Sequence, residues 1–230
     1  KYSFAQDAYT QMTDTGLSPG ANYPIDAGSY ASLQYHTPSL PLSTVITAAY
    51  GQQKNDGQSG NTQGGGSGDS FEGYSLTSAP IEGLTLTAAY YDINDYDDGD
   101  ATEDQLQEGG SYNAEYAIGN ITVGYGKAFL APEASAITAG GTTVEYYENT
   151  GYSVGYAVND ELSVSYSRET NERNMQTSTT TTYDIETDSI QVAYSLGGAT
   201  LSVARADYEN VSYTQNNDAT DTIIALNFAF

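Results

Sequence analysis

The sequence has no cysteine and no tryptophan, and only 6 of its 230 residues are lysine or arginine. A chain without cysteine forms no disulfide bond and no thiolate metal site. Nucleic-acid backbones are bound through basic side chains, and here the 6 cations stand against 30 acidic residues and a net charge of -24. The composition therefore argues against nucleic acid as a partner.

Long apolar runs are also missing. No stretch of about 18 consecutive apolar residues occurs, so the sequence predicts no transmembrane helix. The first residues, KYSFAQDAYT, contain no apolar leader segment, and we expect any signal peptide to have been removed or to lie upstream.

Candidate catalytic groups are scarce. His36 is the one histidine, and it stands beside a predicted turn in LQYHTPS. No serine has a setting that indicates a Ser-His-Asp triad. We therefore expect no enzymatic activity and no cofactor.

Tyrosine is abundant, with 22 residues, and 38% of the chain is hydrophobic, which excludes a disordered acidic chain. Apolar residues alternate with small polar ones in the segments that follow the predicted turns: LTLTAAY, ITVGYGK, LSVSYSR and LSVARAD. Segments that lead into the turns, among them SYNAEYAI, GYSVGYAV and SIQVAYSL, alternate in the same way. A period of two places all the apolar side chains on one face of a β-strand.

Tight turns and long polar segments follow one another in regular alternation. Asn, Asp and Gly at the tight turns, such as Gly119–Asn120 and Gly197–Gly198, favour the positive φ angles of short hairpins. Long polar segments, such as GQQKNDGQSGNTQGGGSGDS, are uncommon in compact soluble domains. We predict twelve strands, at residues 1–10, 28–37, 42–50, 70–79, 84–94, 110–118, 121–130, 144–158, 162–170, 187–196, 199–209 and 220–230.

This rhythm predicts a single all-β domain over residues 1–230, folded as an antiparallel transmembrane β-barrel with short periplasmic turns and long extracellular loops. A soluble β-sandwich or β-solenoid would share the alternation. It would not explain tyrosines on the apolar face beside the loops, where a membrane interface favours aromatic side chains.

The chain ends on TIIALNFAF, in which Ile224, Leu226, Phe228 and Phe230 share one face of the last predicted strand. A strand that ends on phenylalanine, with apolar residues at alternate positions before it, resembles the C-terminal signal of outer-membrane proteins. That resemblance implies recognition by the barrel-assembly machinery. The alternative is a buried terminal strand of a β-sandwich.

Three segments give the chain a resemblance to general porins of Gram-negative bacteria, of the kind found in marine alphaproteobacteria. They are GYSVGYAVNDELSVSYSRE, DSIQVAYSLGGATLSVARADYENVSY and the closing NFAF. The resemblance implies a homotrimer in the cell outer membrane, built from barrels of about 16 strands. The chain is then either the C-terminal portion of such a barrel or a smaller twelve-stranded channel. Its start inside a predicted strand favours the first alternative.

The resemblance also implies a pore. If further strands precede Lys1, residues 11–27 match the loop that narrows the pore of general porins, with Asp14 and Asp26 as its acidic groups. An ordinary external loop is the alternative. Small polar side chains on the predicted lumen face leave room for water, whereas a sealed barrel needs bulky ones. Lumen residues of this kind are Asn113, Glu115 and Gln191.

Two basic residues, Lys127 and Arg168, fall on the apolar face near the loop end of their predicted strands. There they would lie at the outer rim and extend toward lipopolysaccharide phosphates. The alternative is a local β-bulge that turns them into the lumen. Arg205 would be costly facing lipid, so we expect it at a subunit interface, near the rim, or turned inward.

The acidic run from Asp92 to Glu108 resembles a calcium loop in its alternating carboxylates and central glycine, but it lacks the full spacing of one. We interpret it as a solvated loop and predict no metal site. Weak bridging by divalent ions to neighbours or to lipopolysaccharide is a secondary hypothesis.

Together these features predict a water-filled outer-membrane channel for the passive diffusion of small hydrophilic solutes. Its preference for cations follows from the scarcity of basic residues. Two alternatives are a barrel with a closed lumen that acts as an adhesin or receptor, and a soluble extracellular β-protein. The partners expected of the channel are outer-membrane lipids and lipopolysaccharide, the barrel-assembly machinery, further copies of the chain, and the diffusing solutes and cations.

Overall fold

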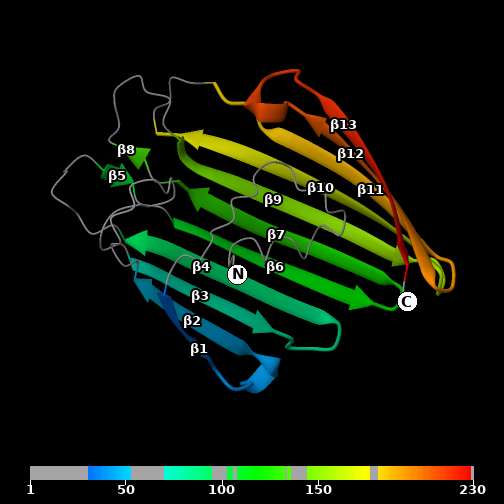
Figure 1. Cartoon of the computed structure of the whole chain (residues 1–230), viewed down its shortest axis with the longest axis horizontal. Coiled ribbons are helices and arrows are strands. Elements are labelled where there is room, and N and C mark those ends of the chain that lie inside the picture. The colour runs from blue at the N-terminus through cyan, green and yellow to red at the C-terminus, as the bar shows by residue number, and fades with distance from the viewer. Residues whose placement is uncertain are drawn as a thin grey trace.

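Eleven strands form a single antiparallel sheet in the computed structural model, which describes residues 31–52, 70–94, 103–105, 108–132, 134–135, 144–176 and 181–228. Each strand between the two edges of the sheet pairs with the sheet strand before it and the one after it in the chain (Figure 1). The strands are β1 (Ala31–His36), β2 (Val45–Gln52), β3 (Ser70–Ser78), β4 (Leu84–Asn94), β6 (Glu108–Ile118), β7 (Ile121–Ala131), β9 (Val144–Ala157), β10 (Leu162–Met175), β11 (Ile185–Ser195), β12 (Ala199–Glu209) and β13 (Ala219–Phe228). Two short strands, β5 (Glu103–Gln105) and β8 (Ala134–Ser135), pair separately with each other.

Helical structure in the described ranges is confined to two 3-10 turns, η2 (Pro41–Ser43) and η3 (Val211–Tyr213). Neither of them, nor any other part of those ranges, is a helix long and apolar enough to cross a membrane.

Eleven of the twelve predicted strands are confirmed, and the twelfth, at residues 1–10, lies outside the described residues. The largest difference in bounds is at the end of β10, which continues to Met175 where the prediction stopped at residue 170. The apolar alternation ends there because the next residues, NERN, are polar on both faces. Backbone pairing continues nevertheless, with Asn171 opposite Asn149 and Arg173 opposite Tyr147.

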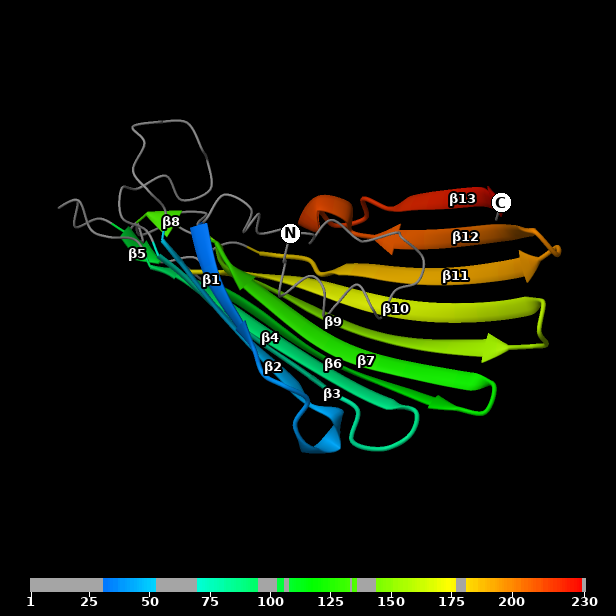
Figure 2. The ribbon, with the colours of Figure 1, turned by 60° about the horizontal axis from the view of Figure 1, so that its bottom comes forward.

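The sheet bends into a trough (Figure 2). Side chains on a concave face converge and shield one another, whereas those on a convex face diverge toward the surroundings. In β4 the alternation follows this rule, because Thr87, Ala89 and Tyr91 are buried while Tyr90 between them is exposed. Within the described residues β1 and β13 each pair with one neighbour, so this part of the sheet does not close on itself.

Strand register keeps the two faces in phase across the whole sheet. One row of directly paired residues crosses six strands of the convex face without interruption: Ile121, Tyr156, Val164, Val192, Val203 and Ile224. The strand ends at the hairpin turns are called the turn end below, and the opposite ends are called the loop end.

A glycine allows the largest buried side chain of the concave face to lie across its neighbour strand. Tyr91 of β4 is 1% exposed and is paired directly with Gly109 of β6. A Cβ atom at Gly109 would lie only 2.6–2.8 Å from atoms of the Tyr91 ring. The ring therefore occupies the space that any side chain at position 109 would need.

Gly109→Ala is expected to destabilise the folded protein by about 1–3 kcal/mol, because the added methyl group overpacks against the Tyr91 ring. Gly155→Ala is the matched control, since its Cβ would meet no atom closer than 3.9 Å. The measurement is urea-induced unfolding of both variants in detergent micelles. Equal unfolding midpoints for the two variants would contradict this account of the Tyr91 contact.

Candidate functional site

The concave face is lined by small polar and small apolar side chains from nearly every strand. Its buried polar members are Thr47, Thr87, Ser111, Asn113, Asn149, Ser167, Glu169, Asn171, Thr187 and Ser189. Between them lie Ala49, Ala89, Ala204 and Ala206, and at the loop end the larger Tyr91, Leu130 and Ile185. Thr, Ser, Asn and Ala are short, so they leave the space inside the trough open.

Hydrogen bonds between directly paired residues hold several of these side chains flat against the sheet. Thr87 donates its hydroxyl to Oδ1 of Asn113 over 2.5 Å. The hydroxyls of Ser167 and Ser189 lie 2.7 Å apart on β10 and β11. A side chain bonded to its cross-strand neighbour is held against the sheet, so the wall presents a fixed polar surface. Other buried polar atoms of the described residues, among them Nδ2 of Asn113, make no hydrogen bond.

A third such bond lies nearer the loop end, where Asn149 Nδ2 donates to Asn171 Oδ1 over 2.6 Å. His36 belongs to the same face, because its Nδ1 lies 3.0 Å from the hydroxyl of the buried Thr47. No serine and carboxylate join it in a triad among the hydrogen bonds of the described residues.

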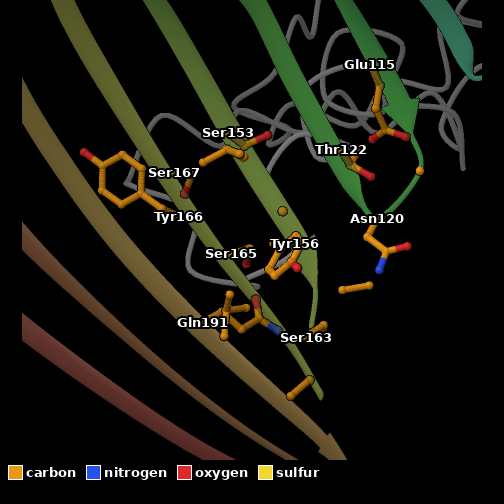
Figure 3. A pocket seen from close by; sticks show the side chains of 16 residues that line it. Glu115, Asn120, Thr122, Ser153, Tyr156, Ser163, Ser165, Tyr166, Ser167 and Gln191 are labelled. Atoms are coloured by element: carbon orange, nitrogen blue, oxygen red, sulfur yellow. The ribbon is translucent and has the colours of Figure 1, made fainter. Parts of the chain in front are cut away.

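At the turn end the concave face forms a hollow of about 530 Å³. Figure 3 shows polar side chains around it, contributed by β6, β7, β9, β10 and β11. They include Glu115, Thr122, Ser153, Ser163 and Gln191. Glu115 is exposed and contributes a negative charge to this wall.

The convex face is apolar and exposed, and its tyrosines fall into two rows. The row at the loop end consists of Tyr50, Tyr74, Tyr90, Tyr112, Tyr125, Tyr152 and Tyr166, and the row at the turn end of Tyr35, Tyr116, Tyr156 and Tyr194. Val, Ile and Leu residues of the same face lie between the two rows. Two aromatic rows that border an apolar band are typical of strands that face lipid.

Carboxylates lie just above the loop-end row and accept hydrogen bonds from it. Tyr90 donates its hydroxyl to Glu108 over 2.8 Å, and Tyr166 donates to Asp188. Tyrosine is suited to this boundary because its ring is apolar and its hydroxyl needs a polar partner. The hydrogen bonds therefore mark the level at which the apolar band ends.

Three of the basic residues lie on the convex face, each beside a carboxylate. Lys127 Nζ lies 2.5 Å from Glu148, and Arg168 forms ion pairs with Glu186 and Asp188. The strand register is regular around both residues, so the predicted alternative of an inward-turning bulge is wrong. Surface pairs of this kind contribute only about 0–1 kcal/mol each to stability.

Arg205 lies lower on the convex face, opposite Ile190 and Thr222. Its side chain is 63% exposed, and its Nη2 lies 2.8 Å from Asp207. Of the three predicted alternatives for Arg205, the inward orientation is therefore wrong. A position near the rim or at a subunit contact stays a prediction.

The concave face carries all three described residues that were predicted for the lumen. Asn113 is buried against Thr87, whereas Glu115 and Gln191 line the hollow. Asp14 and Asp26, with the proposed constriction segment 11–27, lie outside the described residues.

The described apolar residues predicted to share one face of the terminal strand do so. Ile224, Leu226 and Phe228 are exposed on the convex side at 70%, 52% and 59%, and Phe230 lies outside the described residues. The middle of the acidic run, residues 95–102, is likewise not described. In the part of the chain that the structure does describe, no three His, Asp or Glu side chains are grouped as metal ligands.

One cluster had no signal in the sequence. Tyr147 of β9, Arg173 of β10 and Tyr213 of η3 meet at the loop end of the concave face. The contact joins a loop to two strands that are distant from it in the chain, and no local pattern of residues predicts such a contact.

No protein-family profile matches the chain, and no curated protein matches it. Among solved structures, a porin refined at 1.8 Å resolution is similar, with a TM-score of 0.60 and 18% identity over 93% of this chain and 65% of that one. An anion-selective porin from Comamonas acidovorans gives a TM-score of 0.59 and 10% identity over 86% of this chain and 59% of the other. The chain thus spans less than two thirds of the length of either structure. Their identities are low, but the shared arrangement of strands is extensive, and the described eleven-stranded sheet has the fold of part of a porin β-barrel.

Proposed function

We propose that the chain forms the wall of a water-filled channel in the cell outer membrane of a Gram-negative bacterium, through which small hydrophilic solutes diffuse passively. The observation that carries this proposal is the contrast between the two faces of one sheet. The convex face is apolar, exposed and bordered by tyrosine rows, whereas the concave face is small, polar and internally hydrogen-bonded.

A large exposed apolar surface is unusual in a soluble protein, and it supports contact with lipid. A concave wall of Ser, Thr, Asn and Ala supports a lumen filled by water, because bulky side chains would be needed to seal it. Such a channel needs no catalytic group and no cofactor.

We propose that the channel prefers cations. Three of the four basic residues in the described ranges are on the convex face, beside carboxylates and away from the lumen. The concave face carries the carboxylates of Glu115 and Glu169, and the chain as a whole has a net charge of -24. A similar solved porin is described as anion-selective, so the sign of selectivity depends on the lining residues of each chain.

The remaining roles belong to the same proposal. Lys127 and Arg168 would meet lipopolysaccharide phosphates at the rim, above the loop-end tyrosines. Asp14 and Asp26 would narrow the lumen if residues 11–27 fold into it. Assembly as a homotrimer would cover part of the apolar convex face with further copies of the chain.

The first test is electrical. Purified protein reconstituted into planar lipid bilayers is expected to produce stepwise increases in current, each step being the opening of one channel or one oligomer. Bilayers with inserted protein but without such steps would favour the alternative of a closed adhesin or receptor barrel.

The second test concerns charge. In a gradient of KCl, the reversal potential is expected to have the sign of cation preference, and Glu115→Gln is expected to move it toward zero. Glu72→Gln is the control, because Glu72 lies on the convex face and accepts a hydrogen bond from Tyr74 over 3.2 Å. Anion preference of the unaltered protein would refute the charge argument.

A third test addresses assembly. Phe228→Ser is expected to lower the fraction of folded protein in the outer membrane, because the apolar face of β13 would be interrupted where the assembly machinery reads it. Asn227→Ser changes the neighbouring residue on the concave face and is expected to have little effect. The readout is the heat-sensitive electrophoretic shift of the folded form. Equal folded fractions of the Phe228→Ser and Asn227→Ser variants would contradict a role of this face in assembly.

A further inference from the structure

The loop between β12 and β13, Asn210–Asp218, reaches across a neighbouring strand. The ring of Tyr213 lies 5.8 Å from the ring of Tyr147 on β9, and Cζ of Arg173 on β10 lies 4.5 Å from the centre of the Tyr213 ring. In the sheet, β11 separates β12 from β10. The loop therefore crosses β11 to make these contacts.

The contacts lie inside the trough. Tyr147 and Arg173 are directly paired, and each stands two residues along its strand from Asn149 or Asn171. Those two asparagines are buried on the concave face and bonded to each other. Because side chains two apart share a face, Tyr147 and Arg173 also point inward, at the loop end.

Hydrogen bonds give the loop a defined shape. The backbone N–H of Val211 donates to the Asn217 carbonyl over 2.7 Å, and the side chain of Asn217 returns a bond to the Val211 carbonyl over 2.9 Å. Asn210 Nδ2 donates to the Asp184 carbonyl over 3.0 Å, which ties the loop to the start of β11. The loop is therefore held both within itself and against the sheet.

Tyr213 adopts a backbone conformation that costs energy. Its φ angle is 58°, in the left-handed region that a bulky side chain rarely adopts. Such strain persists only where surrounding contacts compensate for it. Here the compensating contacts are those of the ring with Tyr147 and Arg173.

The chemistry of the contact is that of a guanidinium over a neutral ring. Burial raises the pKa of Tyr213 to about 12, the neighbouring Tyr147 acts in the same direction, and Arg173 acts against both. Tyr213 is therefore uncharged at ordinary pH, and the attraction comes from the ring face. Arg173 is also the one basic residue that points inward from the described strands.

We propose that Asn210–Asp218 is an inward-folded arm that narrows the mouth of the channel over β9 and β10, and that Arg173 is the positioning residue that holds it there through Tyr213. This inference rests on the proposed channel function. The arm takes space from the loop end of the lumen, so it lowers the conductance and the size limit for solutes. A loop that merely closed the β12–β13 hairpin would leave both quantities unaffected.

The position of the arm can be tested without measuring current. The chain has no cysteine, so Tyr147→Cys combined with Thr214→Cys introduces two unique thiols and keeps the contact of Tyr213 with Arg173. A flexible bifunctional thiol reagent is expected to join them in the folded, detergent-solubilised protein, as detected by mass spectrometry of the digest. Tyr194→Cys combined with Thr214→Cys is the control, because Tyr194 lies on the convex face at the turn end, and it should give no internal crosslink. Absence of the first crosslink would overturn the proposed position of the arm over β9 and β10.

The effect of the arm is tested by single-channel conductance in planar bilayers. Tyr213→Ala and Arg173→Gln are each expected to increase the conductance and to admit larger neutral polymers, whereas Tyr194→Ala should change neither. Arg173→Lys keeps the charge and can still lie over the ring, so it should stay closer to the wild-type conductance than Arg173→Gln. Wild-type conductance and size limit in Arg173→Gln would overturn the positioning role.

Different results would contradict the proposed narrowing by the arm and the proposed channel function. Unchanged conductance in Tyr213→Ala, with a positive crosslink in the cysteine pair, would contradict the narrowing alone. A protein that crosslinks but never conducts would contradict the proposed channel function, and the narrowing with it.

Discussion

Strand register is the constraint on which the rest of this structure depends. Each strand alternates apolar and polar side chains, and a shift of one residue between neighbours would place a whole strand's apolar set on the wrong face. In the eleven-stranded sheet the described register shifts at one place only, between Asn174 and Met175 near the loop end of β10. The phase is therefore preserved throughout the apolar band. In the proposed channel, one continuous surface faces lipid and the other faces water.

Charged side chains are distributed between the same two faces, and on the convex face they lie mainly near the loop end. Glu72, Asp92 and Glu108 are directly paired on β3, β4 and β6, although like charges in opposite positions repel. Such pairs are tolerable where water screens them, which is the case above the apolar band. Tyrosine hydroxyls use these carboxylates as acceptors, so the same row of acids that repels internally also satisfies the aromatic border beneath it.

Local patterns predicted most of the wall, because each strand carries its own alternation. All eleven strands of the sheet were predicted from this signal, and Asn113, Glu115 and Gln191 were assigned to the polar face on which they lie. The prediction ended β10 too early, since strand pairing persists after the apolar signal stops. It also could not find the contact of Arg173 with Tyr213, which joins residues 40 positions apart through the path of a loop. A long-range contact between single side chains produces no periodic pattern in the sequence.

In the proposed channel, the hairpin of β9 and β10 extends from the lipid into the water beyond it. Each of its strands has 14 residues, against 11 in β4, β6, β7, β11 and β12, and the loop-end portion of β10 at residues 171–174 is polar on both faces. In the proposed channel, apolar contact with lipid stabilises the lower portion, whereas backbone hydrogen bonds and polar contacts in water stabilise the upper portion. Local opening requires less free energy where few apolar groups are buried. Loss of structure should therefore begin at the top of this hairpin and proceed downward, releasing Tyr213 while the lipid-facing strands are still paired.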